Sequence, residues 1–312
     1  MYSYIIKRLL GAIPTLFCVV LISFLMVHMT PGDPFATERA LPPEVLKALH
    51  HQYRLDLPLW QQFLYYVNDL LHGNLGFSYK YQGQSINQLV FPQSGKGGFL
   101  VSVQLGLISL VIATIVGVFI GIISALSRKT KADWLDHIIG IVTMIFISTP
   151  VVVTAPLAVL IFAVWMGLLP AGGWGSWSDM ILPVCVLAIP FIAVIAQITR
   201  SSLIEILTSP FIRTAKAKGL AMPRIIWKHA LKPSLMPVVS FLGPAAAGIL
   251  TGTVVVETVF TIPGIGVQMV QGATNRDYNL VLALTIIYSM LVIIFNLLVD
   301  IIYAFLDPKI RY

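Results

Sequence analysis

The stretch FIRTAKAKGLAMPRIIWKHALKPSLMP, from Phe211 to Pro237, is a basic segment in a chain of mostly apolar residues. It carries six of the 20 Lys and Arg residues, whereas the sequence on either side is almost wholly apolar. The 312 residues are 57% hydrophobic and 11% charged, while a soluble domain usually has about 25% charged residues. Because so little polar surface cannot coat a water-soluble globule, the composition indicates an integral membrane protein.

Six apolar stretches are long enough for helices that cross a bilayer, which need about 20 residues each. We therefore expect an all-α membrane protein with six transmembrane helices. The third stretch is broken by Pro150 and Pro156, which predicts a tilt or a kink. The six stretches are 9–30, 99–126, 137–166, 181–199, 237–259 and 281–305.

The distribution of Lys and Arg predicts the orientation of these helices. With a cytoplasmic N-terminus, the inner segments carry 14 basic residues and the outer segments carry 6. Both termini are therefore expected in the cytoplasm, with 31–98 outside and the loop 200–236 inside. The first apolar run is about 20 residues long, against 7–15 in a signal peptide, so we expect an uncleaved helix. The net charge of +7 is spread over loops between apolar runs, and we expect no nucleic-acid partner.

The outer segment after the first span contains a helix signal, PLWQQFLYYVNDLL, that begins at Pro58. Such a helix lies on the membrane surface or packs against the spans, and the lack of Lys and Arg on its polar face favours packing. His50 and His51 are adjacent and do not share a helical face, so we expect no metal site there. The apolar residues at helical spacing are Trp60, Phe63, Leu64, Val67 and Leu71.

The basic loop is predicted to begin with a short helix from Phe211 to Leu220. Its small apolar sector, about 100° wide, holds Phe211, Ile212, Ala215 and Gly219. Gly inside a helix costs about 1 kcal/mol relative to Ala, so Gly219 indicates either close packing or a helix end. Cytoplasmic loops are basic to set topology and to meet anionic headgroups. That explains a stripe of Arg224, Lys228 and Lys232, but the small-residue sector favours docking of a soluble partner.

Several other sequence features indicate structural roles rather than catalytic or ligand-binding roles. The pair Gly117 and Gly121 predicts tight helix packing, and Cys18 and Cys185 are expected to be buried apolar filler. The segment SGKGG is not a nucleotide-binding loop, because Val90 stands where that motif needs Gly and Gly97 follows Lys96. Ionisable residues within spans are functional candidates, but Glu257 and Asp300 lie near predicted span ends, where we expect them to reach interfacial water or a helix partner.

The loop resembles a motif of inner-membrane permease subunits of ABC importers, in which Glu-Ala-Ala is followed after three residues by Gly. Here Arg213-Thr214-Ala215 takes the first places and Gly219 the last. Arg213 and Thr214 depart from the general pattern, and this form is typical of the peptide-permease branch. Similar stretches span essentially the whole chain: LISFLMVHMTPGDPF, HGNLGFSYKY, VVETVFTIPGIG, NRDYNLV and DPKIRY. LPPEVLKAL and ALKPSLMPV resemble the oligopeptide branch most, while dipeptide, glutathione, nickel and antimicrobial-peptide permeases share the architecture.

The resemblance implies a type I ABC importer permease fold with an extracytoplasmic segment after the first helix. Residues 1–98 would hold that helix and segment, and 99–312 a five-helix core. The implied activity is non-catalytic movement of oligopeptides across a bacterial inner membrane into the cytoplasm. The chain itself would bind no cofactor, while ATP and Mg are used by its partners. Those partners would be a second permease subunit, two cytoplasmic ATPases and an extracytoplasmic peptide-binding protein.

The resemblance also implies two functional segments. The helix at 211–222 would couple to the ATPase, with Phe211, Ile212, Ala215 and Gly219 as its packed face. The full coupling set is Phe211, Ile212, Arg213, Thr214, Ala215, Lys216, Lys218 and Gly219. The fifth span would line the translocation path with Ala246, Ala247, Gly248, Thr251, Gly252 and Glu257.

Two functions of other classes compete with this interpretation. An autonomous secondary transporter needs broken helices, charged sites at mid-membrane or an internal repeat, and the sequence has no clear repeat. A membrane-embedded enzyme needs a nucleophile–base pair or a metal constellation, and none is visible.

Overall fold

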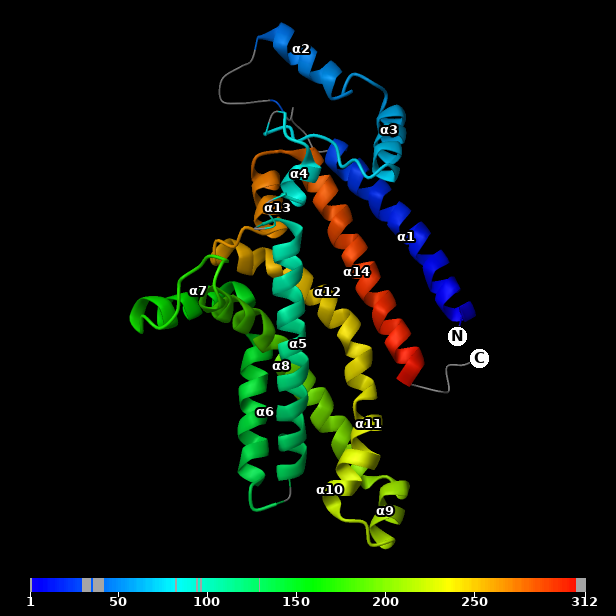
Figure 1. Ribbon diagram of the computed structural model, residues 1–312, viewed down its shortest axis with the longest axis vertical. Helices are drawn as coiled ribbons and strands as arrows, with labels where there is room; N and C mark the ends of the chain where they lie inside the picture. Colours follow the sequence, from blue (N-terminus) through cyan, green and yellow to red (C-terminus); the bar gives the residue numbers. More distant parts are fainter. Residues whose placement is uncertain are drawn as a thin grey trace. The chain divides into compact units, whose positions relative to one another are not determined.

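The computed structural model describes residues 2–29, 35, 42–81, 83–93, 95, 97–128 and 130–306, whose regular structure is helical. Figure 1 shows the helices in chain order. They are α1 (Tyr2–Met29), α2 (Pro43–Gln52), α3 (Leu59–Leu71), α4 (Ile86–Val90), α5 (Phe99–Ser127), α6 (Asp133–Ser148), α7 (Val151–Ala158), the π-helix η1 (Val159–Trp165), α8 (Trp177–Thr208), α9 (Pro210–Ala217), α10 (Met222–Arg224), the π-helix η2 (Ile225–Ala230), α11 (Leu231–Ser234), α12 (Met236–Val259), α13 (Ile265–Thr274) and α14 (Tyr278–Leu306).

Among the described residues, five single helices are long and apolar enough to cross a membrane. They agree with the membrane class and confirm a long apolar helix at five of the six expected stretches. The membrane-capable stretches are Leu10–Met29, Phe99–Ser127, Trp177–Thr208, Met236–Val259 and Tyr278–Ile302.

The expected third span, 137–166, is instead a broken element. Its two parts, α6 and α7 with η1, meet at an angle of 104°. Thr149 is extended, with φ −95° and ψ 117°, because Pro150 disfavours the helical conformation of the residue before it. In Figure 1, α7 turns away from the end of α6. The proline signal therefore predicted the break correctly, although not its size.

The chain forms two compact units. The first comprises Met1–Arg8, Ser102–Ile262 and Leu291–Tyr312, and the second comprises Leu9–Val101 and Pro263–Met290. Each unit is assembled from separate stretches of sequence. The expected division of the chain into residues 1–98 and 99–312 stays a prediction.

In the first unit, α8 packs closely against its neighbours because glycines remove side chains from the contacts. A Cβ atom on Gly121 of α5 would lie 2.5 Å from the carbonyl oxygen of Ala196, and one on Gly117 would lie 2.8 Å from Ile195 Cβ. On α12, a Cβ atom at Gly252 would lie 2.9 Å from Leu187 Cδ1. These contacts confirm tight internal packing as the role of Gly117 and Gly121.

We expect Gly121→Ala to destabilise the protein by about 1–3 kcal/mol, because its methyl group overlaps backbone that has little room to move. Gly140→Ala is the matched control. Gly140 is also helical, but a Cβ atom there would meet no heavy atom of the described residues within 4 Å, apart from its own stretch of helix. Thermal unfolding of the purified variants in detergent checks this, and equal stability of the two would contradict the packing account.

In the second unit, α3 packs against α1 and α14. Phe63, Tyr66, Val67 and Leu70 of α3 contact a cluster formed by Val20, Phe24, Leu282 and Ile286. This confirms the preference for packing over an isolated surface helix. The predicted apolar face was wrong in part, since Trp60, Leu64 and Leu71 are 62%, 57% and 80% exposed.

The segment between α3 and α5 is fastened to the loop that precedes α14. Asp277 is buried and accepts hydrogen bonds from the Ser78 hydroxyl and from the backbone N–H of Tyr79, the latter at 3.0 Å. Gly98 N–H donates to the carbonyl oxygen of Pro263 at 2.7 Å. Gly98 has φ +67°, and a Cβ atom there would overlap the Val90 carbonyl oxygen. The glycines of SGKGG thus include one required by backbone packing.

Candidate functional site

The short helix α9 follows α8 directly, with Ser209 between them in an extended conformation. Pro210 occupies its first turn, where the missing N–H of proline leaves no bond unmade. Gly219 has φ +76°, and the N–H of Leu220 donates to the Ala215 carbonyl at 3.3 Å. The expected helix end at Gly219 is confirmed, and this residue is needed there for its left-handed conformation.

The face of α9 that was expected to meet a partner packs instead on the chain itself. Ile212 is fully buried in a cluster with Leu203 of α8 and Ile225 of η2, and Ala215 packs against the same cluster. Only Phe211 and Gly219 of the four predicted residues are exposed. The apolar sector was identified correctly, but its function is to anchor α9 to the end of α8.

The exposed residues of α9 and of the segment that follows it include several basic side chains and two large apolar ones. Phe211 is 48% exposed, and Met222 at the start of α10 is 43% exposed. Figure 1 shows α9 and α10 together beyond the end of α8. We call this surface the α9 tip and define it by the exposed residues Phe211, Arg213, Thr214, Lys216, Lys218 and Met222.

Substitutions at Gly219 are expected to destabilise the α9 tip through backbone strain. The left-handed conformation costs an L-residue about 1–2 kcal/mol, and Asn tolerates it better than Ala. The predicted order of stability is therefore Gly, Asn, Ala, Val. A Cβ atom at Gly219 would meet no described atom within 4 Å beyond its chain neighbours, so side-chain size in itself is not the cause. Limited proteolysis of the loop measures the order, and Val resisting cleavage as well as Gly would contradict it.

On α12, the structure separates the six candidate path residues. Ala246 and Glu257 are buried inside the chain, which corrects their assignment to an outward path. Gly248 and Gly252 adjoin Phe191 and Leu187 of α8. Thr251 is exposed and Ala247 is half-buried.

The exposed stripe of α12 includes residues that the sequence reasoning missed. Pro237, Ser240, Pro244, Thr251 and Thr258 recur at steps of three, four and seven residues and are all exposed. Each hydroxyl donates to its own helix, as Ser240 does to Met236 O at 3.2 Å and Thr258 to Val254 O at 2.7 Å. The hydroxyl oxygens keep lone pairs that can accept hydrogen bonds. The helical spacing of these hydroxyl and proline residues in the sequence could have predicted this exposed face.

An ion pair between a half-buried Arg and a buried carboxylate joins three helices in the first unit. Arg200 of α8 donates from Nε and Nη2 to the two carboxylate oxygens of Asp136 of α6, at 2.5 and 2.6 Å. Ser124 of α5 donates to the same carboxylate at 2.5 Å. Asp136 is 5% exposed. Both charged residues fall in segments that were expected to be loops, so this bidentate contact was not anticipated.

No group of three His, Cys, Asp or Glu side chains suited to a metal ion occurs within the described ranges. Cys18 and Cys185 are both exposed, which corrects the expectation of buried filler. Cys185 lies between the buried Val184 and Val186, so it occupies the outer face of α8.

Comparisons with known proteins match nearly the whole chain. The family model described as "Binding-protein-dependent transport system inner membrane component" matches residues 117–312. The model described as "Binding-prot-dependent transport system membrane comp, N-term" matches residues 1–85. The oligopeptide transport system permease proteins OppB of Haemophilus influenzae and Escherichia coli K12 are each 49% identical over 314 residues, which is 100% of both chains. The dipeptide transport system permease protein DppB of Lactococcus lactis is 39% identical over 311 residues, again 100% of both chains.

Proposed function

Because the chain belongs to the family of binding-protein-dependent transport system inner membrane components, we propose that it is a non-catalytic permease subunit of an ATP-driven importer of oligopeptides. The observation that carries the substrate class is the 49% identity to oligopeptide permeases over the full length. Dipeptides are the second candidate, since a dipeptide permease is 39% identical over the full length. Three further candidate substrates are supported by the family resemblance alone: glutathione, nickel and antimicrobial peptides.

The proposed topology has six crossings, and a hydrogen bond at one end of the spans supports it. Gly98 and Pro263 are joined at 2.7 Å, so they lie on the same side of the membrane. Three candidate spans, α5, α8 and α12, separate them in the sequence. An even number of crossings is needed, so the bent element of α6, α7 and η1 supplies the fourth.

An ion pair at the other end of the spans supports the same count. Arg8 Nε lies 3.2 Å from Asp300 Oδ2, which supports a common side of the membrane for the start of α1 and the last part of α14. The segments expected on that side carry 14 of the 20 basic residues, which supports a cytoplasmic location for it. Both termini and the α9 tip are then cytoplasmic, and the segments 31–98, 167–180 and 260–280 face the periplasm.

In this proposal, ATP binding, formation of the path and delivery of the peptide belong to different chains of one transporter. Two cytoplasmic ATPases bind ATP and Mg, a second permease subunit completes the path, and an extracytoplasmic binding protein delivers the peptide. The present chain docks one ATPase through the α9 tip. Its exposed Phe211 supplies an aromatic anchor, and the exposed Arg213, Lys216 and Lys218 give the same short segment positive charge.

The packing of α9 against the end of α8 supports a role in force transfer. Because Ile212 is buried against Leu203 of α8, a displacement of the α9 tip moves the end of α8 with it. The ion pair between Arg200 and Asp136 then ties α8 to α6. We place the peptide path along the exposed stripe of α12, where Ser240, Thr251 and Thr258 present hydroxyl oxygens to peptide N–H groups.

Peptide uptake by proteoliposomes tests the proposal. The complete assembly, with its binding protein and internal ATP, is expected to accumulate labelled tri- to pentapeptides, and omission of the ATPases is expected to abolish uptake. Competition by unlabelled dipeptides distinguishes the second substrate class. Uptake by this chain alone, driven by an ion gradient, would show an autonomous secondary transporter instead.

A further inference from the structure

The helix α3 has three distinct faces, and two of them contact other described segments of the chain. At about 100° per residue, the packed stripe of Phe63, Tyr66, Val67 and Leu70 forms the first face. Trp60, Leu64 and Leu71 form a second face that is apolar and exposed. Gln61, Gln62, Tyr65, Asn68 and Asp69 form the third face, which is polar.

The depth of α3 can be read from its contacts with α1. Phe63 packs edge-on against Phe24, with ring centroids 5.3 Å apart, and against Phe17 at 6.1 Å. Phe24 and Phe17 precede the end of the span at Met29, and a rise of 1.5 Å per residue puts them about 8 and 18 Å below that end. The span Leu10–Met29 has 20 residues, enough for about 30 Å of hydrocarbon and no more. The half of this span that ends at Met29 is therefore needed to cross the hydrocarbon layer and does not lie in water.

The helix α14 gives a second and independent measure of depth. Its residues in the same cluster are Leu282 and Ile286. They follow the start of the span at Tyr278, and lie about 6 and 12 Å below that end. Both spans thus place the packed face of α3 inside the hydrocarbon layer rather than beyond it.

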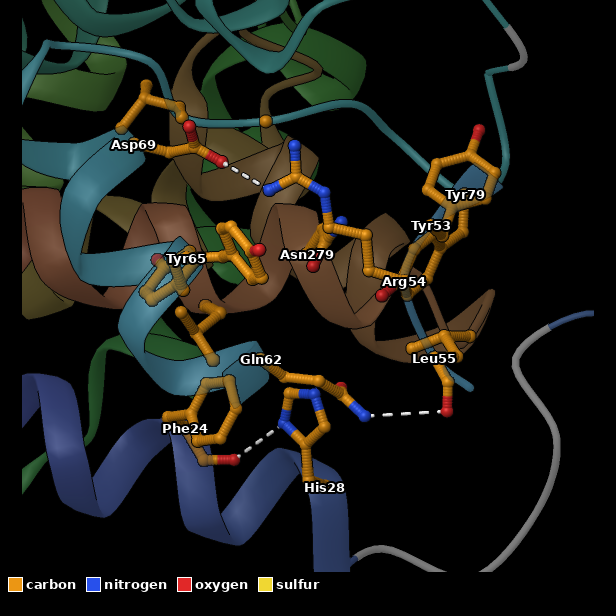
Figure 2. Close-up of a pocket in the computed structure, with 14 residues that line it drawn as sticks. Phe24, His28, Tyr53, Arg54, Leu55, Gln62, Tyr65, Asp69, Tyr79 and Asn279 are labelled. Carbon is orange, nitrogen blue, oxygen red and sulfur yellow. Dashed lines mark hydrogen bonds and ion pairs between the residues drawn. The ribbon is translucent and has the colours of Figure 1, made fainter. Parts of the chain in front are cut away.

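The polar face of α3 lies against the segment 54–57, which supplies partners for its polar groups. In Figure 2, Gln62, Tyr65 and Asp69 face the segment that holds Arg54 and Leu55. Arg54 lies 3.6 Å from the Asp69 carboxylate and 4.5 Å from the centre of the Tyr65 ring. Gln62 donates to the Leu57 carbonyl oxygen at 2.7 Å. The charges are paired on the side where water or headgroups would be expected.

We propose that α3 lies embedded in one leaflet of the bilayer, with Trp60, Leu64 and Leu71 in contact with lipid acyl chains. An amphipathic helix in the plane of the interface buries its apolar face at this boundary, and Trp is enriched there. The leaflet is the periplasmic one if the proposed orientation is correct. The segment after α1 is thus anchored to lipid as well as to the protein.

Nitroxide labels on α3 test this placement in the complete assembly, reconstituted in phospholipid nanodiscs. Cys18→Ala and Cys185→Ala remove the exposed native thiols. Leu64→Cys is compared with Tyr65→Cys, its neighbour of similar exposure, 57% against 49%, on the polar side. A second pair compares Trp60→Cys with Gln61→Cys. Collision rates are measured with oxygen, which partitions into hydrocarbon, and with a water-soluble nickel chelate.

Labels at positions 60 and 64 are expected to collide more with oxygen, and labels at 61 and 65 more with nickel. High nickel accessibility at position 64 would overturn the proposal, because α3 would then lie in water. Low accessibility of position 64 to both reagents would also overturn it, since another protein subunit would cover that face. Labelling of Tyr65→Cys in intact cells with an impermeant thiol reagent tests the orientation separately, because nanodiscs expose both leaflets equally.

Discussion

Arg200→Met is expected to destabilise the protein by about 3–5 kcal/mol, because it leaves a buried carboxylate without its cation. The carboxylate of Asp136 receives both guanidinium bonds, at 2.5 and 2.6 Å, and only 5% of this residue is exposed. Unfolding of the purified chain, followed in detergent with increasing denaturant, measures the loss. Arg213→Met, which removes an exposed Arg from the α9 tip, is the matched control and is expected to change stability little.

The double variant Asp136→Asn, Arg200→Met separates charge burial from packing. Removing both charges takes away the desolvation penalty along with the attraction, so most of the lost stability is expected to return. A double variant as unstable as Arg200→Met alone would mean that the loss of stability does not come from an unpaired buried carboxylate.

Phe211→Ala is expected to weaken docking of the ATPase, and so to lower peptide uptake, while the chain still inserts and folds. Phe211 is 48% exposed, so its loss removes little from the core. An aromatic anchor at the centre of an interface contributes about 2 kcal/mol or more, which corresponds to roughly a thirtyfold weaker affinity for the ATPase. Uptake and peptide-stimulated ATP hydrolysis in proteoliposomes are both expected to fall.

The control for this variant is Trp134→Ala. Trp134 is an aromatic residue at the start of α6, outside the α9 tip, and is 59% exposed. It is expected to retain coupled transport. Equal loss in the two variants would point to a general effect of removing exposed aromatic residues rather than to a docking surface at Phe211.

The spans could be predicted because hydropathy is a local property of the sequence. The starts and ends of α5 and α12 agree with the apolar runs within one residue, whereas α8 continues to Thr208, well beyond its apolar run. Pro150 predicted a kink, but the 104° bend depends on the extended conformation of Thr149 and on what the two arms pack against. Local rules therefore located the break without giving its angle.

The candidate site was less predictable, because periodicity defines a helical face and not what covers it. The apolar sector of α9 suited an external partner as well as it suited the chain's own core, and Ile212 proved to lie in the core. On α3 the apolar sector is wide, and protein covers only the half around Phe63 and Val67. Asp136 and Arg200 are 64 residues apart in the sequence, and only the packing of α6 on α8 brings them together.

A photo-cross-linking amino acid at Phe211 tests the central claim most directly, namely that energy from ATP enters this chain through the α9 tip. Trp177 is the matched position, an exposed aromatic residue at the other end of α8, about 47 Å away along a 32-residue helix. In the assembled transporter, illumination is expected to join Phe211 to an ATPase subunit and to give no ATPase product from Trp177. An ATPase product from Trp177, or none from Phe211 in an assembly that still transports peptide, would contradict the account.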